Sequence, residues 1–212
     1  MNSKIASQDY LDYLLKGNRK NANQICNAYL NNSGTIKDLY ELVMKPALYE
    51  VGNLWEQNKI SVASEHLATA ITEGILNTYY PYIIPEKYNG KKVVLACVNK
   101  EEHQVGIKMA ADIFEMNHWE SHFLGSGFPT SELIKYIKET QPNLIAISLS
   151  VYFNYIAFMQ MIIDLKTAYP DIPIIAGGQA ISHFADSSFD EWNDITFITD
   201  LNQLEDYIIQ SK

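Results

Sequence analysis

From Lys92 onward, short apolar runs alternate with helix-length stretches, and this alternation constrains the fold more than any other feature of the sequence. Residues 93–98 (VVLACV) are apolar throughout, as expected of a strand buried on both faces. Strands joined by helices in this way form a parallel sheet, and five of them fit a flavodoxin-like, doubly wound α/β domain whose ligands lie at the carboxyl ends of the strands. We expect strands over residues 93–98, 119–124, 144–148, 172–176 and 195–198, and helices over residues 105–116, 130–140, 152–168 and 201–210.

The first part of the chain has a different periodicity. Residues 7 to about 80 carry apolar side chains three and four positions apart, which is the spacing of amphipathic helices. An Asn-Asn-Ser-Gly break at 31–34 precedes Thr35, a residue type that caps helices, and Ser61 begins a further helix. Pro46 lies within one helical stripe, where its missing N–H predicts a kink. These segments predict a four-helix bundle.

Turn-forming residues separate the two patterns. Pro81, Pro85 and an Asn-Gly pair at 89–90 are typical of a linker. We therefore expect an N-terminal helical bundle over residues 1–85, followed by a Rossmann-like domain over residues 86–212.

Charge and composition exclude several classes of function. The formal net charge is −9, and no basic run of five or more residues exists, so we expect no direct binding to nucleic acid. No apolar run approaches the roughly 20 residues of a membrane span, and the N-terminus has no apolar signal segment, so we expect a cytoplasmic protein. Cys26 and Cys97 stand far apart and in no CxxC motif, which favours two buried thiols over a zinc site.

Three short motifs in the α/β half stand at fixed separations. Glu101, His103 and Gly106 form an acid-x-His-x-x-Gly motif, and 41 residues separate Gly106 from Ser148. A further 26 residues separate Ser148-Leu149-Ser150 from a Gly-Gly pair at 177–178. Each part is weak by itself, since a lone histidine is more often a surface or capping residue and a glycine pair is more often a turn. The combined spacing carries the information.

This arrangement resembles the cobalamin-binding signature, acid-x-His-x-x-Gly, Ser-x-Leu/Thr and Gly-Gly. The resemblance implies that His103 is the lower axial ligand of a corrinoid cobalt and that Glu101 orients its ring. It also implies that several further residues line the cofactor or its nucleotide tail: Gly106, Gly125, Ser148, Ser150, Gly177 and Gly178. Two positions depart from the usual pattern, since Glu101 replaces an aspartate and Ser150 replaces a leucine or threonine.

A second pattern lies in the helical half. Nine residues separate Trp55 from the pair Glu65-His66, and Val62 lies seven residues after Trp55. The pattern resembles the helical cap of MerR-type, B12-dependent photoreceptor regulators. The resemblance implies that Trp55 and Val62 pack on the adenosyl group of adenosylcobalamin, and that Glu65 and His66 contact its polar edges. Taken alone, a tryptophan on an apolar stripe is more often a core residue, and a Glu-His pair at a helix start is more often part of a solvated first turn.

Two departures from the photoreceptor pattern affect the predicted function. The resemblance covers residues of roughly 7 to 210, so we expect the cap and the Rossmann-like domain without the family's DNA-binding module. In addition, Glu56 stands where those regulators have the histidine that becomes the new upper ligand after illumination. His66 is the nearest alternative ligand.

Three functions compete on this basis. The first is a cobalamin-binding sensor, light-responsive through adenosylcobalamin, that signals through a protein partner or as a homo-oligomer. The second is a corrinoid carrier protein of a methyltransferase system, and the third is an interaction protein whose motifs are coincidental. No acid–base pair, nucleophilic triad or metal cluster in the sequence calls for catalysis by the chain alone, so we expect a binding protein rather than an enzyme.

Overall fold

The computed structural model describes residues 1–32, 34–183 and 195–211. The chain divides into two compact units, Met1–Tyr82 and Ile83–Lys212, and each is described by itself. In the described residues, no helix combines the length and the apolar character that crossing a membrane requires.

The first unit is helical. The segment from residue 36 to residue 56 is continuous, so the described part of this unit has the four helical segments that the sequence predicts. Its elements are α1 (Ser3–Leu15), α2 (Arg19–Asn31), α3 (Ile36–Leu39), the π-helix η1 (Tyr40–Met44), α4 (Lys45–Glu56) and α5 (Val62–Ile83). Apolar side chains fill the centre of the unit, and the buried Tyr10 and Thr72 hydroxyls are hydrogen-bonded at 2.9 Å.

Local signals in the sequence set the ends of these helices. Thr35 caps α3 as predicted, in a capping box with Asp38. The Ser61 hydroxyl accepts a hydrogen bond from the Ser64 N–H at the start of α5. The disturbance expected at Pro46 takes the form of the π-helical turn η1 directly before it, where the Lys45 N–H donates to the Tyr40 carbonyl five residues back.

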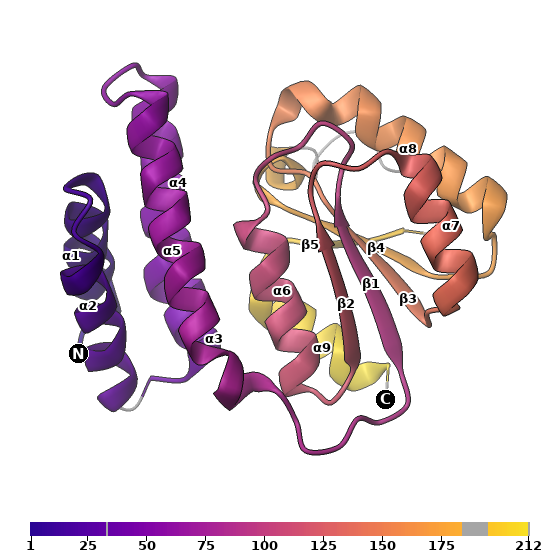
Figure 1. The fold of residues 1–212 in the computed structure, drawn as a ribbon, viewed down its shortest axis with the longest axis horizontal. Helices are drawn as coiled ribbons and strands as arrows, with labels where there is room; N and C mark the ends of the chain where they lie inside the picture. The colour runs from indigo at the N-terminus through magenta and orange to yellow at the C-terminus, as the bar shows by residue number, and fades with distance from the viewer. Residues whose placement is uncertain (33, 184–194, 212) are drawn as a thin grey trace. The chain divides into compact units, whose positions relative to one another are not determined.

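The second unit is a five-stranded, all-parallel sheet with helices on both faces (Figure 1). Its strand order is β2-β1-β3-β4-β5, which is the order of flavodoxin-like folds and confirms the predicted fold class. The strands are β1 (Lys92–Cys97), β2 (Glu120–Gly125), β3 (Leu144–Ser148), β4 (Ile174–Gly177) and β5 (Ile195–Ile198). The helices are α6 (Val105–Met116), α7 (Thr130–Thr140), the 3₁₀ turn η2 (Tyr152–Asn154), α8 (Tyr155–Ala168), the 3₁₀ turn η3 (Gln179–His183) and α9 (Leu201–Gln210).

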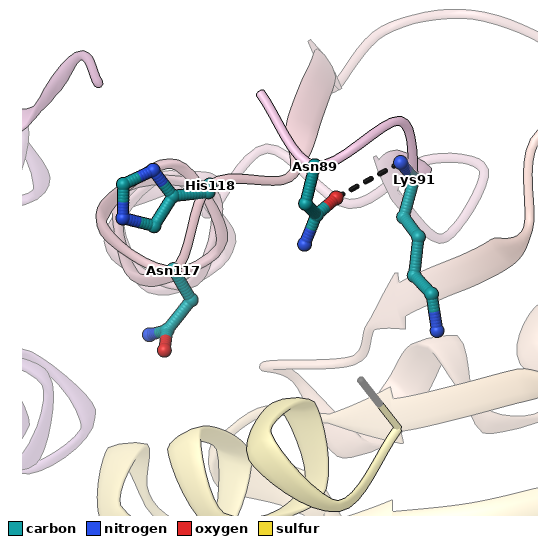
Figure 2. Close-up of a pocket in the computed structure, with 4 residues that line it drawn as sticks. All are labelled: Asn89, Lys91, Asn117 and His118. Carbon is teal, nitrogen blue, oxygen red and sulfur yellow. Dashed lines mark hydrogen bonds between the residues drawn. The ribbon is translucent and has the colours of Figure 1, made fainter. Parts of the chain in front are cut away.

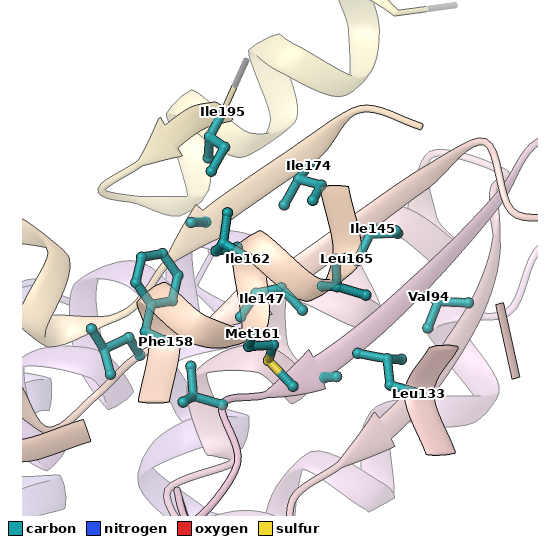
Figure 3. Packing of buried hydrophobic residues seen from close by; sticks show 14 of the residues in the cluster. Val94, Leu133, Ile145, Ile147, Phe158, Met161, Ile162, Leu165, Ile174 and Ile195 are labelled. Carbon is teal, nitrogen blue, oxygen red and sulfur yellow. The ribbon is translucent and has the colours of Figure 1, made fainter. Parts of the chain in front are cut away.

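Alternate side chains of each central strand enter two separate cores. Val94 of β1 packs with α7 and α8 on one face, whereas Val93 and Leu95 pack with α6 and α9 on the other. Figure 3 shows the first of these cores, in which Leu133, Phe158 and other helical side chains cover the sheet. Because both faces of the sheet are covered, the side chains left for a ligand are those at its edges.

Candidate functional site

Strand register brings the separate motifs together at the carboxyl edge of the sheet. Ser148, the last residue of β3, is paired with Cys97 at the end of β1 on one side and with Gly177 at the end of β4 on the other. Gly125, at the end of β2, is paired with Ala96 of β1. Residues up to 80 positions apart in the chain therefore form one row, and the loop that carries His103 leaves from the same edge.

His103 is held by the carboxylate of Glu101. The distance from Nδ1 of the ring to Oε1 of Glu101 is 2.5 Å, and the His103 backbone N–H donates to the same oxygen at 3.1 Å. The Glu101 side chain is 1 % exposed, whereas the imidazole is 40 % exposed. The ring is therefore fixed from the protein side while part of it faces outward.

The second oxygen of Glu101 connects this loop to the turn after β3. Oε2 accepts hydrogen bonds from the Ser150 N–H at 3.2 Å, the Val151 N–H at 3.0 Å and the Asn154 side-chain amide at 3.2 Å. The sequence analysis did not identify Asn154, because no spacing rule links it to Glu101. The longer side chain of glutamate, compared with the usual aspartate, thus reaches five donors from two loops.

These bonds fix the charge of Glu101 and the tautomer of His103. Burial on its own would raise the pKa of the Glu101 carboxyl, but hydrogen bonds from the His103 ring, the His103 N–H and the Val151 N–H hold the pKa below its ordinary value. An ionised carboxylate only accepts hydrogen bonds, so Nδ1 of His103 carries the hydrogen of this contact. A histidine whose Nδ1 is held by a carboxylate in this way has the arrangement of many metal-ligating histidines, in which the other ring nitrogen is the donor to the metal.

Cys97 borders the same loop and is not reactive. Its thiol is buried, and its Sγ lies 3.7 Å from the His103 carbonyl oxygen. Burial, together with the nearby Glu101 charge, raises the pKa of the Cys97 thiol to about 12. The thiol is therefore neutral at physiological pH and acts as a small core side chain.

Different structural constraints explain why glycine stands at each of these positions. At Gly178 (φ +114°), an added Cβ would lie 2.2 Å from the Leu149 carbonyl oxygen, and at Gly177 it would lie 3.0 Å from a backbone oxygen of β5. Gly125 has a φ of +71°, and an added Cβ would meet the Gln104 side chain at 2.5 Å. At Gly106, by contrast, no atom of the described residues lies within 4 Å of an added Cβ, apart from its chain neighbours and the backbone of its own helix. The fold itself explains the first three glycines, whereas Gly106 borders open space beside the His103 loop.

The residues predicted from the helical half lie around the turn between α4 and α5. Trp55 is 37 % exposed and Val62 is 52 % exposed, so neither is a core residue of the described structure. Glu65 is buried, and its carboxylate accepts a hydrogen bond from the Thr69 hydroxyl at 2.9 Å and lies 3.1 Å from Nδ1 of the exposed His66. The end of α4 and the start of α5 thus carry an exposed indole and an exposed valine, and the Glu65 carboxylate of α5 is held by Thr69 and His66.

A hollow at the opposite edge of the sheet does not coincide with these residues. It has a volume of about 310 Å³ and is lined by Asn89, Lys91, Asn117 and His118 (Figure 2). The Lys91 ammonium already has partners within the protein. It donates a hydrogen bond to the Ser211 carbonyl after α9 and lies 5.3 Å from the centre of the Trp119 ring. We place the functional site at the carboxyl edge, because the oriented His103 and its buried support lie there.

Comparison with known proteins shows the family to which the chain belongs. Residues 6–79 match one family model and residues 91–195 match another, and both families are described as B12 binding domains. The chain belongs to the B12-binding family. It is a cobalamin-binding protein, and the residues at the carboxyl edge fit that group, since His103 is an imidazole held through Nδ1 by a carboxylate, which is a common arrangement of metal-ligating histidines.

Two curated relatives come from Myxococcus xanthus and are described as HTH-type transcriptional repressors. CarH is 26 % identical over 143 residues, which is 66 % of this chain and 47 % of the relative. CarA is 26 % identical over 133 residues, which is 63 % of this chain and 44 % of the relative. The chain therefore matches less than half the length of these repressors.

Solved structures share the fold at lower identity. The monomethylamine corrinoid protein of Methanosarcina barkeri aligns over 100 % of both chains with a TM-score of 0.82 and 11 % identity. The methanol:cobalamin methyltransferase complex MtaBC of the same organism aligns over 98 % of this chain and 81 % of that chain, with a TM-score of 0.51 and 16 % identity. These likenesses show a helical unit followed by a Rossmann-like unit.

Proposed function

We propose that this chain is a cobalamin-dependent sensor that binds adenosylcobalamin, responds to light and passes the signal to a protein partner or through self-association. The observation that carries the proposal is that Trp55, near the end of α4, and Val62, at the start of α5, are both exposed, while Glu65 of α5 is buried. A ligand that packs on the helical unit would cover these two apolar side chains. An adenosyl group offers a flat apolar base and ribose hydroxyls, which match an indole and a carboxylate.

Each predicted residue has a distinct part in this proposal. His103 would supply a ring nitrogen to the cobalt, and Glu101 would orient the ring through Nδ1. Gly106, Gly125, Ser148, Ser150, Gly177 and Gly178 form the carboxyl edge that borders the cofactor and its nucleotide tail. When bound, adenosylcobalamin supplies a cobalt–carbon bond that light can break. Trp55 and Val62 exclude water from the upper ligand, Glu65 accepts from the ribose, and His66 lies beside it.

The first experiment compares cofactor forms in the dark and after green light. We expect adenosylcobalamin to bind more tightly than methylcobalamin, and its absorption spectrum and the size of the complex to change on illumination. Trp55→Ala should weaken binding of adenosylcobalamin at least about tenfold and leave methylcobalamin binding nearly unchanged. The matched control is Tyr80→Ala, an exposed aromatic residue of α5 outside the predicted pocket. A loaded protein that is identical in spectrum, size and partner binding in dark and light would exclude the sensor.

A corrinoid carrier for methyl transfer is the second candidate, and one observation favours it. Glu56, exposed and directly after Trp55, offers a carboxylate where the photoreceptor pattern has a histidine ligand. A carrier needs no second protein ligand, because its upper face must stay open to a methyl donor and acceptor. Preferential binding of methylcobalamin and transfer of its methyl group to a thiol acceptor by an added methyltransferase would establish this function. In either role we propose that the chain binds and presents the cofactor and is not itself the catalyst.

A further inference from the structure

The most exposed large apolar side chain of the described residues lies just beyond the carboxyl edge of the sheet. Phe153, in the turn η2 between β3 and α8, is 95 % exposed. A single exposed apolar residue is common on protein surfaces and carries little information by itself. The position of Phe153 carries more, because its turn follows directly on Ser148, the last residue of β3, and on Ser150.

Glu101 fixes the backbone on both sides of Phe153. The Val151 N–H donates to Oε2 of the carboxylate at 3.0 Å, and the Asn154 side-chain amide donates to the same oxygen at 3.2 Å. The Asn154 backbone N–H donates to the Val151 carbonyl at 3.0 Å, which closes the turn around Phe153. The aromatic ring therefore projects from an ordered turn, and a contact that it makes with a ligand costs little backbone entropy.

The same carboxylate holds the His103 ring. Oε1 of Glu101 lies 2.5 Å from Nδ1 of the imidazole, so the two oxygens of one buried group hold the His103 loop and the Phe153 turn next to each other. A corrin ring extends in every direction from its cobalt. A cobalt bound to a ring nitrogen of His103 would therefore bring the corrin over the segments that border this histidine, and the Phe153 turn is one of them.

The chemical character of this turn suits a corrin ring. Residues 148–157 contain no charged side chain, although the whole chain carries a net charge of −9. The rim of a corrin carries methyl groups and neutral carboxamide side chains, so it packs on apolar surface and needs no ion pair. A phenyl ring offers a large apolar area at a small loss of side-chain freedom. A protein partner would also cover such a ring, but the link through Glu101 to His103 favours the cofactor.

We propose that Phe153 is a contact residue for the corrin ring and that its apolar packing contributes to cobalamin affinity. Because the turn is linked to the cobalt ligand, the contact is with the ring around the cobalt rather than with the upper ligand or the nucleotide tail. Its contribution is therefore the same for adenosylcobalamin, for methylcobalamin and for a cobinamide, which lacks the tail. The inference rests on the proposed part of His103 as a cobalt ligand, and it requires neither light nor an adenosyl group.

The test is calorimetric titration of the full chain in the dark with adenosylcobalamin, methylcobalamin and aquocyanocobinamide. Phe153→Ala should weaken binding of all three about tenfold, and Phe153→Leu, which keeps an apolar side chain, should recover most of the loss. The matched control is Ile209→Ala on α9, a residue that is 50 % exposed and lies two positions before Ser211 at the opposite edge of the sheet. It should bind like wild type. Trp55→Ala should affect adenosylcobalamin alone, so a failure of the sensor proposal is distinguished from a failure of this one.

A labelling experiment reports the contact directly. Since Cys26 and Cys97 are buried, Phe153→Cys provides an accessible thiol. Saturating cobalamin should slow the reaction of this thiol with a maleimide several-fold and leave the reaction of Ile209→Cys unchanged.

Two controls separate the causes of a negative result. Circular dichroism should show that Phe153→Ala is folded like wild type, because the phenyl ring is almost fully exposed. Electron paramagnetic resonance of the cobalt(II) form with isotope-labelled histidine reports whether His103 binds the cobalt, independently of Phe153. Unchanged affinity of Phe153→Ala for all three corrinoids, a loss confined to the two that carry the tail, or a Phe153→Cys thiol that reacts equally fast with and without cobalamin would overturn the proposal.

Discussion

Glu101→Gln is the most informative single substitution, because it keeps the size of the side chain and removes its charge. The carboxylate accepts five hydrogen bonds, two at Oε1 from His103 and three at Oε2 from Ser150, Val151 and Asn154. An amide has one accepting oxygen and one donating NH₂ group. If the oxygen of the amide faces the three donors at Oε2, its NH₂ group faces the two N–H groups of His103. In the opposite orientation the NH₂ group faces three donors, so more donors lose their acceptor.

The structure gives a magnitude for this conflict. The His103 backbone N–H loses its acceptor, which costs about 1–3 kcal/mol when the group is shielded from water, and the remaining bonds lose their charge assistance. We expect the free energy of unfolding to fall by about 2–4 kcal/mol at pH 7. The His103 ring can bond the new NH₂ group only by accepting at Nδ1, which moves its hydrogen to Nε2. That nitrogen then has no lone pair for cobalt, and we expect cobalamin affinity to fall about 10- to 100-fold.

The pH dependence has a definite sign. Because the folded-state pKa of Glu101 is lowered, its contribution to stability is present above the unfolded value of about 4.3 and is lost as the pH falls through the folded value. The difference between wild type and Glu101→Gln should therefore shrink in acid. Urea unfolding followed by circular dichroism at several pH values measures it. Glu102→Gln is the matched control, since its neighbouring carboxylate is exposed. Equal stability of the two variants at pH 7, with equal cobalamin affinity, would refute the reasoning.

Three further predictions concern the same unit. Gly178→Ala should lower the free energy of unfolding by about 2–4 kcal/mol, because its Cβ would overlap the Leu149 carbonyl at a φ of +114°, whereas Gly106→Ala should leave stability unchanged and weaken cobalamin binding. Asn154→Ala removes one donor from the carboxylate below the ligand, and calorimetric titration with cobalamin should show an affinity several-fold lower at nearly unchanged fold stability. Burial raises the pKa of Glu115 against hydrogen bonds from a tyrosine and a backbone N–H, so its stabilising contribution is full below about pH 4.3 and declines as the pH rises through its folded value. Glu115→Gln should remove that decline in urea unfolding between pH 4 and 7, and a variant with an unchanged pH profile would contradict the assignment.

Most of the fold could be predicted from the sequence because its signals are local. An unbroken apolar run such as 93–98 predicts a strand buried on both faces, and a threonine three residues before an aspartate predicts the start of a helix. Three of the five strands end one residue from the predicted carboxyl end, which matters here because the site lies at those ends. Pro46 predicted a disturbance in its helix, but a π-helical turn depends on how the neighbouring side chains pack and could not be foreseen.

The site was less accessible to sequence reasoning. His103 and Glu101 are two residues apart, so their contact could be expected from the spacing alone. Asn154 lies 53 residues from Glu101, and only the pairing of β3 with β1 brings the two together. The exposure of Trp55 could not be predicted either, because a tryptophan on an apolar stripe has the same pattern whether it faces a core or a ligand.

The hydrogen bonds of Glu101 also order events during folding. The three bonds at its Oε2 join residues 49 to 53 positions apart, and such contacts form only after the loop between them has closed. A newly made chain therefore has no oriented His103 until β3 has taken its place beside β1. We expect cobalamin to bind the folded α/β unit in preference to a partly folded one. Because the ligand binds the folded state, it shifts the folding equilibrium toward that state. In a cell, the supply of the vitamin would set the lifetime of the protein as well as its state.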